Sequence, residues 1–146
     1  MKPDDWVGRK PKPKYYMDAY EYAHNYVSIF NKKPKELNDE YKNQGLGNFL
    51  QLRTLNVTFW MDADLKKERA LGTYQAEGVR SHKSPSGLIK IDIRAHNDDF
   101  NKIKETIRHE ITHAIAHQIK GCQDNGHNEI WRQIAIENKV NTHNYI

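Results

Sequence analysis

Apolar residues recur at two spacings along the chain, one typical of helices and one typical of strands. Helical spacing runs through residues 15–30 and predicts an amphipathic helix whose aromatic residues lie in the core. Pro34 lacks a backbone N–H and its ring clashes with the preceding turn, so this helix is expected to end before it. The polar segment 36–48, which carries two glycines, is expected to form a short helical turn or a loop.

Three segments in the middle of the chain show the alternation of a half-buried strand. Leu55, Val57 and Phe59 alternate with polar residues, and a second candidate strand runs through residues 70–79. The clearest pattern spans residues 88–94, where three isoleucines share one face after a turn of serine, proline and glycine. These segments together predict a small sheet.

Two further helices are predicted in the C-terminal third. The first begins after Asn97-Asp98-Asp99, whose side chains can cap it, and stops at Gly121. The arc of this helix that is expected to face the core consists of Phe100, Ile103, Ile107, Ile111, Ala114 and Gln118. The last helix follows Asp124-Asn125-Gly126 and runs to about Asn138. Its buried residues are expected to be Ile130, Trp131, Ile134, Ala135 and Ile136.

The composition indicates a soluble chain with one domain. Of the 146 residues, 37% are hydrophobic and 29% are charged, and no apolar stretch is long enough to span a membrane. The N-terminus lacks the apolar run of a secretory signal, so the expected location is the cytoplasm, without a membrane partner. Because Cys122 is the only cysteine, any metal must bind to histidines and carboxylates.

The formal net charge of +4 is partly concentrated near the N-terminus. Residues 1–14 interleave five basic side chains with prolines, which predicts a flexible, solvated arm before a single domain over residues 15–146. A mildly basic chain permits contact with DNA through these residues but does not require it.

The helix expected before Gly121 contains His109-Glu110-Ile111-Thr112-His113. Two histidines four residues apart lie one turn apart at similar azimuths, so both imidazoles can reach one metal ion. A glutamate directly after the first histidine is placed to take a proton from a water that zinc activates, which is metallopeptidase chemistry. The caps and the apolar arc of this helix disfavour a chance match.

A catalytic zinc usually has three protein ligands, so a third is required. His117 continues the four-residue series, but about 12 Å of helix separates it from His109, too far for one tetrahedral ion. Ala116 and Ile119 occupy the places of the glycine and the third histidine of the metzincin pattern, which excludes that class. Spacing leaves three candidates for the third ligand: His127, Glu129 and Glu137. It favours His127 over the two glutamates only slightly.

These residues resemble the SprT-like metallopeptidase family, which includes the Spartan proteases that digest DNA–protein crosslinks. The resemblance covers about residues 15–140 and rests on Leu71-Gly72, the strand from Ile89 to Ile93, the His109–His113 motif, and Gly126-His127 followed by Trp131. It differs in Asn128, where the family often has glycine, and the sequence has no Cys-rich zinc module such as many members carry.

The resemblance implies a small α+β, zincin-like domain in which the active-site helix packs on a short, mostly antiparallel sheet. It also implies that His127 is the third zinc ligand beside His109 and His113, with Glu110 as the catalytic base. The expected function is a zinc-dependent endopeptidase that cleaves a protein or peptide, with DNA-associated proteins as one substrate class.

Two further expectations concern the substrate. The strand from Ile89 to Ile93 is expected to pair with an extended peptide at a sheet edge. The side chain that stabilises the oxyanion is expected among Tyr74, His82 and Tyr145.

The alternative function is a non-catalytic, zinc-stabilised module that binds nucleic acid or protein, but a purely structural zinc site has no use for the base Glu110.

Overall fold

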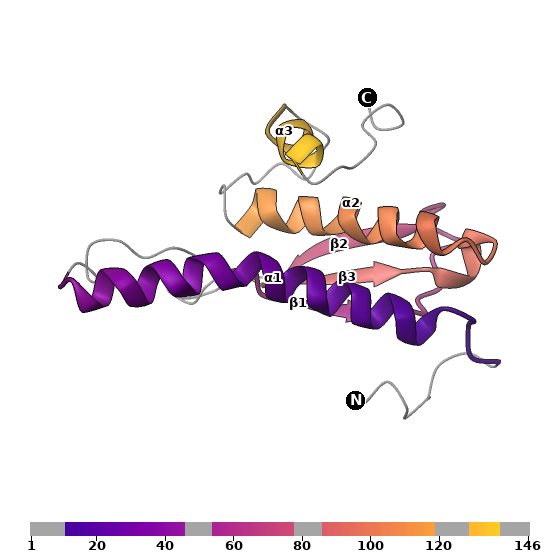
Figure 1. Ribbon diagram of the computed structural model, residues 1–146. Coiled ribbons are helices and arrows are strands. Elements are labelled where there is room, and N and C mark those ends of the chain that lie inside the picture. Colours follow the sequence, from indigo (N-terminus) through magenta and orange to yellow (C-terminus); the bar gives the residue numbers. More distant parts are fainter. Residues whose placement is uncertain (1–10, 46–53, 78–85, 119–128, 138–146) are drawn as a thin grey trace.

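The computed structural model describes residues 11–45, 54–77, 86–118 and 129–137 (Figure 1). The first half of the chain forms one long helix, α1 (Tyr16–Asn43), and two short strands, β1 (Val57–Trp60) and β2 (Gly72–Glu77). The second half forms β3 (Ser86–Ile91), a 3₁₀ turn η1 (Ile93–His96) and two helices, α2 (Phe100–Gln118) and α3 (Glu129–Glu137). Helices and strands do not alternate regularly, which confirms the predicted α+β class.

The three strands form one mixed sheet in the order β1-β3-β2. β1 runs parallel to β3, whereas β2 runs antiparallel to it, so the sheet has one pairing of each kind. The central strand β3 is hydrogen-bonded on both sides and cannot accept an extended peptide. The prediction that the strand from Ile89 to Ile93 offers a free edge is therefore wrong, because both edges of the sheet lie on other strands.

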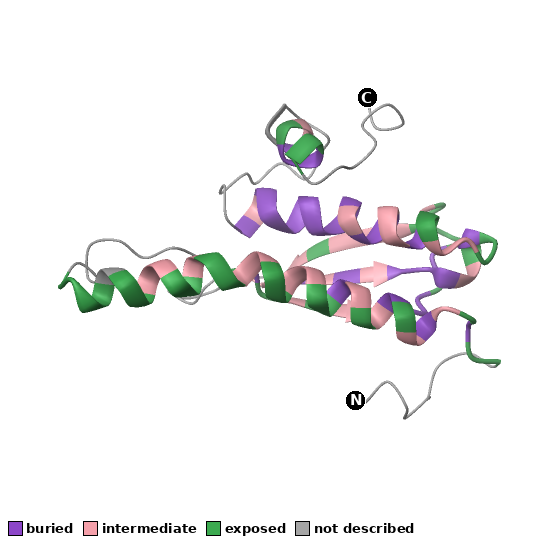
Figure 2. Ribbon diagram, viewed as in Figure 1, coloured by how far each residue is buried: buried purple, intermediate pink, exposed green. Residues whose placement is uncertain are grey.

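The core lies between one face of this sheet and the two long helices (Figure 1). In β3, Ile89 and Ile91 are fully buried on this face, whereas Leu88 and Lys90 on the opposite face are half-buried. The predicted arc of α2 packs against the same face, with five of its six residues fully buried: Ile103, Ile107, Ile111, Ala114 and Gln118. Figure 2 shows that the C-terminal half of α2 is almost entirely buried, whereas its N-terminal half carries exposed and half-buried residues as well.

α1 continues through Pro34, contrary to the predicted end before it. Asn31, one turn earlier, anchors the helix, because its side-chain amide bonds both the N–H and the C=O of Leu55 at 2.7 and 2.9 Å. Beyond Pro34 the helix projects past the sheet and is mostly exposed (Figure 2). Good helix formers follow the proline, and most residues of this segment are exposed, so one missing hydrogen bond is tolerated.

Predicted and observed elements otherwise agree closely in the described residues, except that the strand predicted to reach Arg94 ends at Ile91 and is followed by the 3₁₀ turn η1. The segment 36–48 is helical up to Asn43, and the chain then turns at Gly45, whose φ is +76°. The last helix is present, but Ile136 is 68% exposed and not buried as expected. On a helix it lies about 140° from Trp131, and therefore outside the face that packs on α2.

The described end of the N-terminal arm, residues 11–14, contacts the domain. Pro13 is buried, and the guanidinium of Arg94 donates to the carbonyl of Pro11 while it also forms an ion pair with Asp62 at 2.9 Å. Among the described residues, no helix is long and apolar enough to cross a membrane.

Candidate metal centre

α2 carries the candidate metal ligands, and its local sequence determines where it starts. The carboxylate of Asp99 accepts the backbone N–H groups of Asn101 at 3.1 Å and Lys102 at 3.3 Å, which is the side-chain cap that the sequence predicts. Burial of the apolar arc against the sheet then fixes the rotation of α2 about its axis. The polar residues of the central turns are thereby held inside the protein and not on a solvated face.

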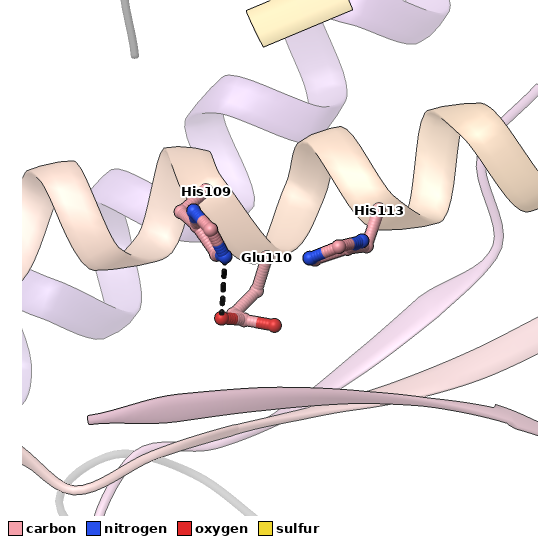
Figure 3. Close-up of side chains that lie close together, drawn as sticks. All are labelled: His109, Glu110 and His113. Atoms are coloured by element: carbon pink, nitrogen blue, oxygen red, sulfur yellow. Dashed lines mark ion pairs between the residues drawn. The ribbon is translucent and has the colours of Figure 1, made fainter. Parts of the chain in front are cut away.

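His109, Glu110 and His113 form a compact cluster in the middle of α2. One ligand atom of each residue lies within 4.8 Å of those of the other two, and Nε2 of His109 is 3.6 Å from Oε2 of Glu110. The three residues are only 6%, 4% and 9% exposed. Figure 3 shows the two imidazole rings on either side of the glutamate. The structure thus brings together the three residues that the motif predicts, in a group able to hold a metal ion.

Glu110 is buried where β2 passes closest to α2. A Cβ atom built on Gly72 would lie 3.1 Å from Cγ of Glu110 and 2.8 Å from Cγ2 of Thr106, so the backbone of β2 lies directly against the side chain of Glu110. This burial raises the pKa of Glu110 to about 8. A carboxylate removed from water is costly unless a cation lies beside it. Two imidazoles and a buried carboxylate are therefore a donor set that fits a divalent metal ion.

Trp131 of α3 covers the two histidines. Its ring centroid lies 4.9 Å from that of His109, in an edge-to-face arrangement, and 5.3 Å from that of His113. The indole is 1% exposed, as the sequence predicts for a buried residue. The periodicity of α3 predicted its burial but gave no sign that its neighbours would be the candidate metal ligands.

A second polar group lies at the end of α2. The hydroxyl of Tyr74 on β2 is 2.8 Å from Nδ1 of His117 and accepts a hydrogen bond from Nε2 of Gln118 at 3.0 Å. The amide of Gln118 also bonds both backbone groups of Asn56, at 2.7 and 3.0 Å. His117 therefore binds Tyr74 and is not in the metal cluster, as its distance along the helix predicts.

Gln118 has a role that the sequence did not reveal. Its place in the apolar arc marked it as buried, and it is 0% exposed. A buried glutamine must satisfy its amide, which is the one signal that pointed to partners. Its partners are Asn56, which directly precedes β1, and Tyr74 on β2. Gln118 therefore connects the end of α2 to both edge strands of the sheet.

The remaining predicted site residues are only partly within the described chain. His127, the ligand implied by the resemblance, lies outside it, as do His82 and Tyr145. Glu129 starts α3, and its side chain is not among those described, whereas Glu137 ends α3 and is exposed. Tyr74 is the one described candidate for the oxyanion-stabilising group, and its hydroxyl already has two partners.

Comparison with known proteins gives one match. The sequence model of the SprT-like family matches residues 35–145, which include every strand, α2 with its His-Glu-His cluster, and α3. No curated protein and no solved structure matches the chain. A match over most of the chain, with the metal-capable residues inside it, shows that this protein belongs to the SprT-like family.

Proposed function

We propose that the protein is a zinc-dependent endopeptidase in which His109, His113 and His127 hold the metal and Glu110 is the catalytic base. The observation that carries this proposal is the buried cluster of two imidazoles and one carboxylate on α2, with ligand atoms within 4.8 Å of one another. Membership of the SprT-like family supports the same chemistry, because the family is one of metallopeptidase-like proteins.

The two imidazoles are suited to zinc, which prefers nitrogen and sulfur ligands and, in catalytic sites, leaves one coordination position open. Two residues of one helix cannot surround an ion, so the third ligand must come from elsewhere in the chain. His127 is proposed for this place because it lies two residues before the start of α3, whose Trp131 already packs on His109 and His113. When bound, zinc would polarise the peptide carbonyl and make the attacking water more acidic.

Glu110 would move the proton during hydrolysis. A carboxylate whose pKa is raised by burial binds a proton more readily than an exposed one. It would take a proton from the attacking water and then pass it to the nitrogen of the departing amine. Glu110 is only 4% exposed, so this proton would not be readily lost to solvent.

The edge strand β2 would hold the substrate. The N–H of Asp92 donates to the carbonyl of Leu71, which shows that Leu71 and every second residue after it in β2 direct their backbone groups toward β3. The backbone groups that point away from β3, where no described strand pairs with β2, are consequently those of Gly72, Tyr74 and Ala76. An extended peptide paired there would lie alongside Glu110, and backbone pairing would impose little sequence preference.

Replacing Glu110 by Gln tests the proposal. The variant should retain zinc, measured by elemental analysis, and lose cleavage of an unstructured protein such as casein by a factor of at least 100. Glu105→Gln is the matched control, because Glu105 lies on the same helix outside the cluster and should cut at the wild-type rate. Cleavage by Glu110→Gln at the wild-type rate would exclude this mechanism.

A hydroxamate separates the enzyme from a zinc-stabilised binding module. A catalytic site has an open coordination position and should bind the hydroxamate, with loss of cleavage, whereas a structural site closed by four protein ligands should not.

N-methylation of single backbone positions in a peptide substrate tests the strand pairing. Methyl groups at alternate positions should lower kcat/KM more than those between them, because only alternate residues face β2.

A further inference from the structure

The contact between Trp131 and the two histidines joins α3 to the candidate metal centre. Trp131 and Ala135 form a small buried cluster separate from the main core, and both are at most 1% exposed. α3 has only nine residues, and a helix of this length has little stability in water without packing. Its attachment to α2 therefore depends strongly on the few residues that it buries there, of which Trp131 is the largest.

The same contact restricts the two imidazole rings. The indole meets His109 at an interplanar angle of 62° and His113 at 31°, so a single rigid side chain packs against both rings. The ring centroids of His109 and His113 are 4.9 Å apart. The indole therefore limits the space available to each ring. The orientation in which both rings face one ion is thus maintained by a residue on another helix.

We propose that Trp131 is a positioning residue for the metal-binding histidines, and that metal binding and docking of α3 are coupled through it. Because a coupling between two events is reciprocal, docking of α3 strengthens metal binding, and a bound metal stabilises the docked helix. Residues that surround metal-bound histidines, usually hydrogen-bonding ones, commonly fix the orientation of the ring, and here an aromatic side chain would do so by packing.

The proposal rests on the metal site of the proposed function, and zinc affinity is its first test. Competition with a chromophoric chelator should show zinc binding weakened about 10-fold or more in Trp131→Leu and recovered in large part in Trp131→Phe, which restores an aromatic ring. Ile134→Ala is the control for loss of packing, since Ile134 is buried on the same helix but carries no aromatic ring. Ile136→Ala, at an exposed position, should bind zinc as the wild type does.

Equal weakening in Trp131→Leu and Ile134→Ala would overturn the proposal, because general loosening of α3 would then explain both. Fluorescence provides a second test that leaves Trp131 intact. The chain has three tryptophans, so Trp6→Phe and Trp60→Phe leave Trp131 as the only indole. Adding zinc to the metal-free form should change its emission, and adding magnesium should not.

The possible failures are distinguishable. If the wild-type chain binds no zinc, the proposed function fails. If it binds zinc but the emission of Trp131 is unchanged and Trp131→Leu binds as tightly as the wild type, only the role of Trp131 fails.

Discussion

Gly72 and Glu110 approach each other so closely that a Cβ atom on the glycine would lie 3.1 Å from Cγ of the glutamate. The same Cβ would lie 2.8 Å from Thr106, closer than real side chains come without a shift. β2 can cover the carboxylate only because residue 72 has no side chain. The burial of Glu110, and with it the raised pKa, therefore depends on a glycine in another element.

Gly72→Ala is predicted to disturb this contact. The added methyl group must displace β2 or the side chains of α2, at a cost of about 1–3 kcal/mol in the free energy of unfolding. Denaturant unfolding measures this cost, and proteolysis by the variant should fall as Glu110 moves. Gln75→Ala, at an exposed position on the same strand, should change stability by less than about 0.5 kcal/mol. Wild-type stability and activity in Gly72→Ala would contradict the packing described.

The raised pKa of Glu110 predicts a pH dependence of stability in the metal-free protein. In the folded state the pKa is about 8, against about 4.5 in the unfolded chain, so the folded protein retains a proton that the unfolded chain releases between these values. Stability is therefore highest below about pH 4.5 as far as this group is concerned, and it falls as the pH rises toward 8. The loss is on the order of a few kcal/mol.

Glu110→Gln should remove this dependence, because its side chain does not titrate. The free energies of unfolding of the two metal-free proteins, measured from pH 5 to 8, should diverge with increasing pH in favour of the variant. Zinc should abolish the difference in slope, since a nearby cation favours the charged carboxylate. Parallel curves in the absence of metal would show that the carboxylate is not desolvated.

His96 predicts a pH dependence of opposite sign. It is 1% exposed, and its Nδ1 lies 2.7 Å from the carbonyl of Asp92 and its Nε2 lies 2.8 Å from the hydroxyl of Thr106. The carbonyl can only accept, so Nδ1 carries the hydrogen and Nε2 accepts from Thr106. Burial lowers the pKa of His96, so its contribution to stability is present above about pH 6.5 and is lost as the pH falls below that value.

Comparison of the wild type with His96→Gln isolates this contribution. Below pH 6.5 the free energy of unfolding of the wild type should decrease more steeply than that of the variant, and above pH 7 the two curves should run parallel. Chemical unfolding at pH 5.0, 6.0, 7.0 and 8.0 is sufficient for the comparison. Equal slopes over the whole range would show that His96 is accessible to protons in the folded state.

Gln118 is predicted to stabilise the sheet from the end of α2. Gln118→Leu keeps the volume but leaves Asn56 and the Tyr74 hydroxyl without this partner, so it should cost about 1–3 kcal/mol. Tyr74→Phe should cost less, because only the hydroxyl is lost. In the double variant the two costs should not add, since the residues share a hydrogen bond. Gln133→Leu, at an exposed position on α3, is the control.

The local patterns of the sequence predicted most of the elements. The alternation around β1 and β3, the cap of Asp99 and the arc of α2 depend only on neighbours a few residues away, and the structure confirms each. Predictions that needed the surroundings were wrong, among them the free edge of the strand from Ile89 to Ile93. The end of α1 before Pro34 assumed that one missing hydrogen bond stops a helix, and the burial of Ile136 assumed a wider contact face than α3 has.

In the candidate site too, some relationships follow from local helix geometry and others only from tertiary packing. The sequence by itself determined that His109, Glu110 and His113 lie together, because the geometry of a helix fixes residues one and four positions apart. Only the tertiary structure decided that, among the described strands, β2 and not β3 lies at the sheet edge beside them, that Gly72 packs against the glutamate, and that Trp131 covers the histidines. These relationships join residues far apart in the chain, and they arise from packing, which no local pattern encodes.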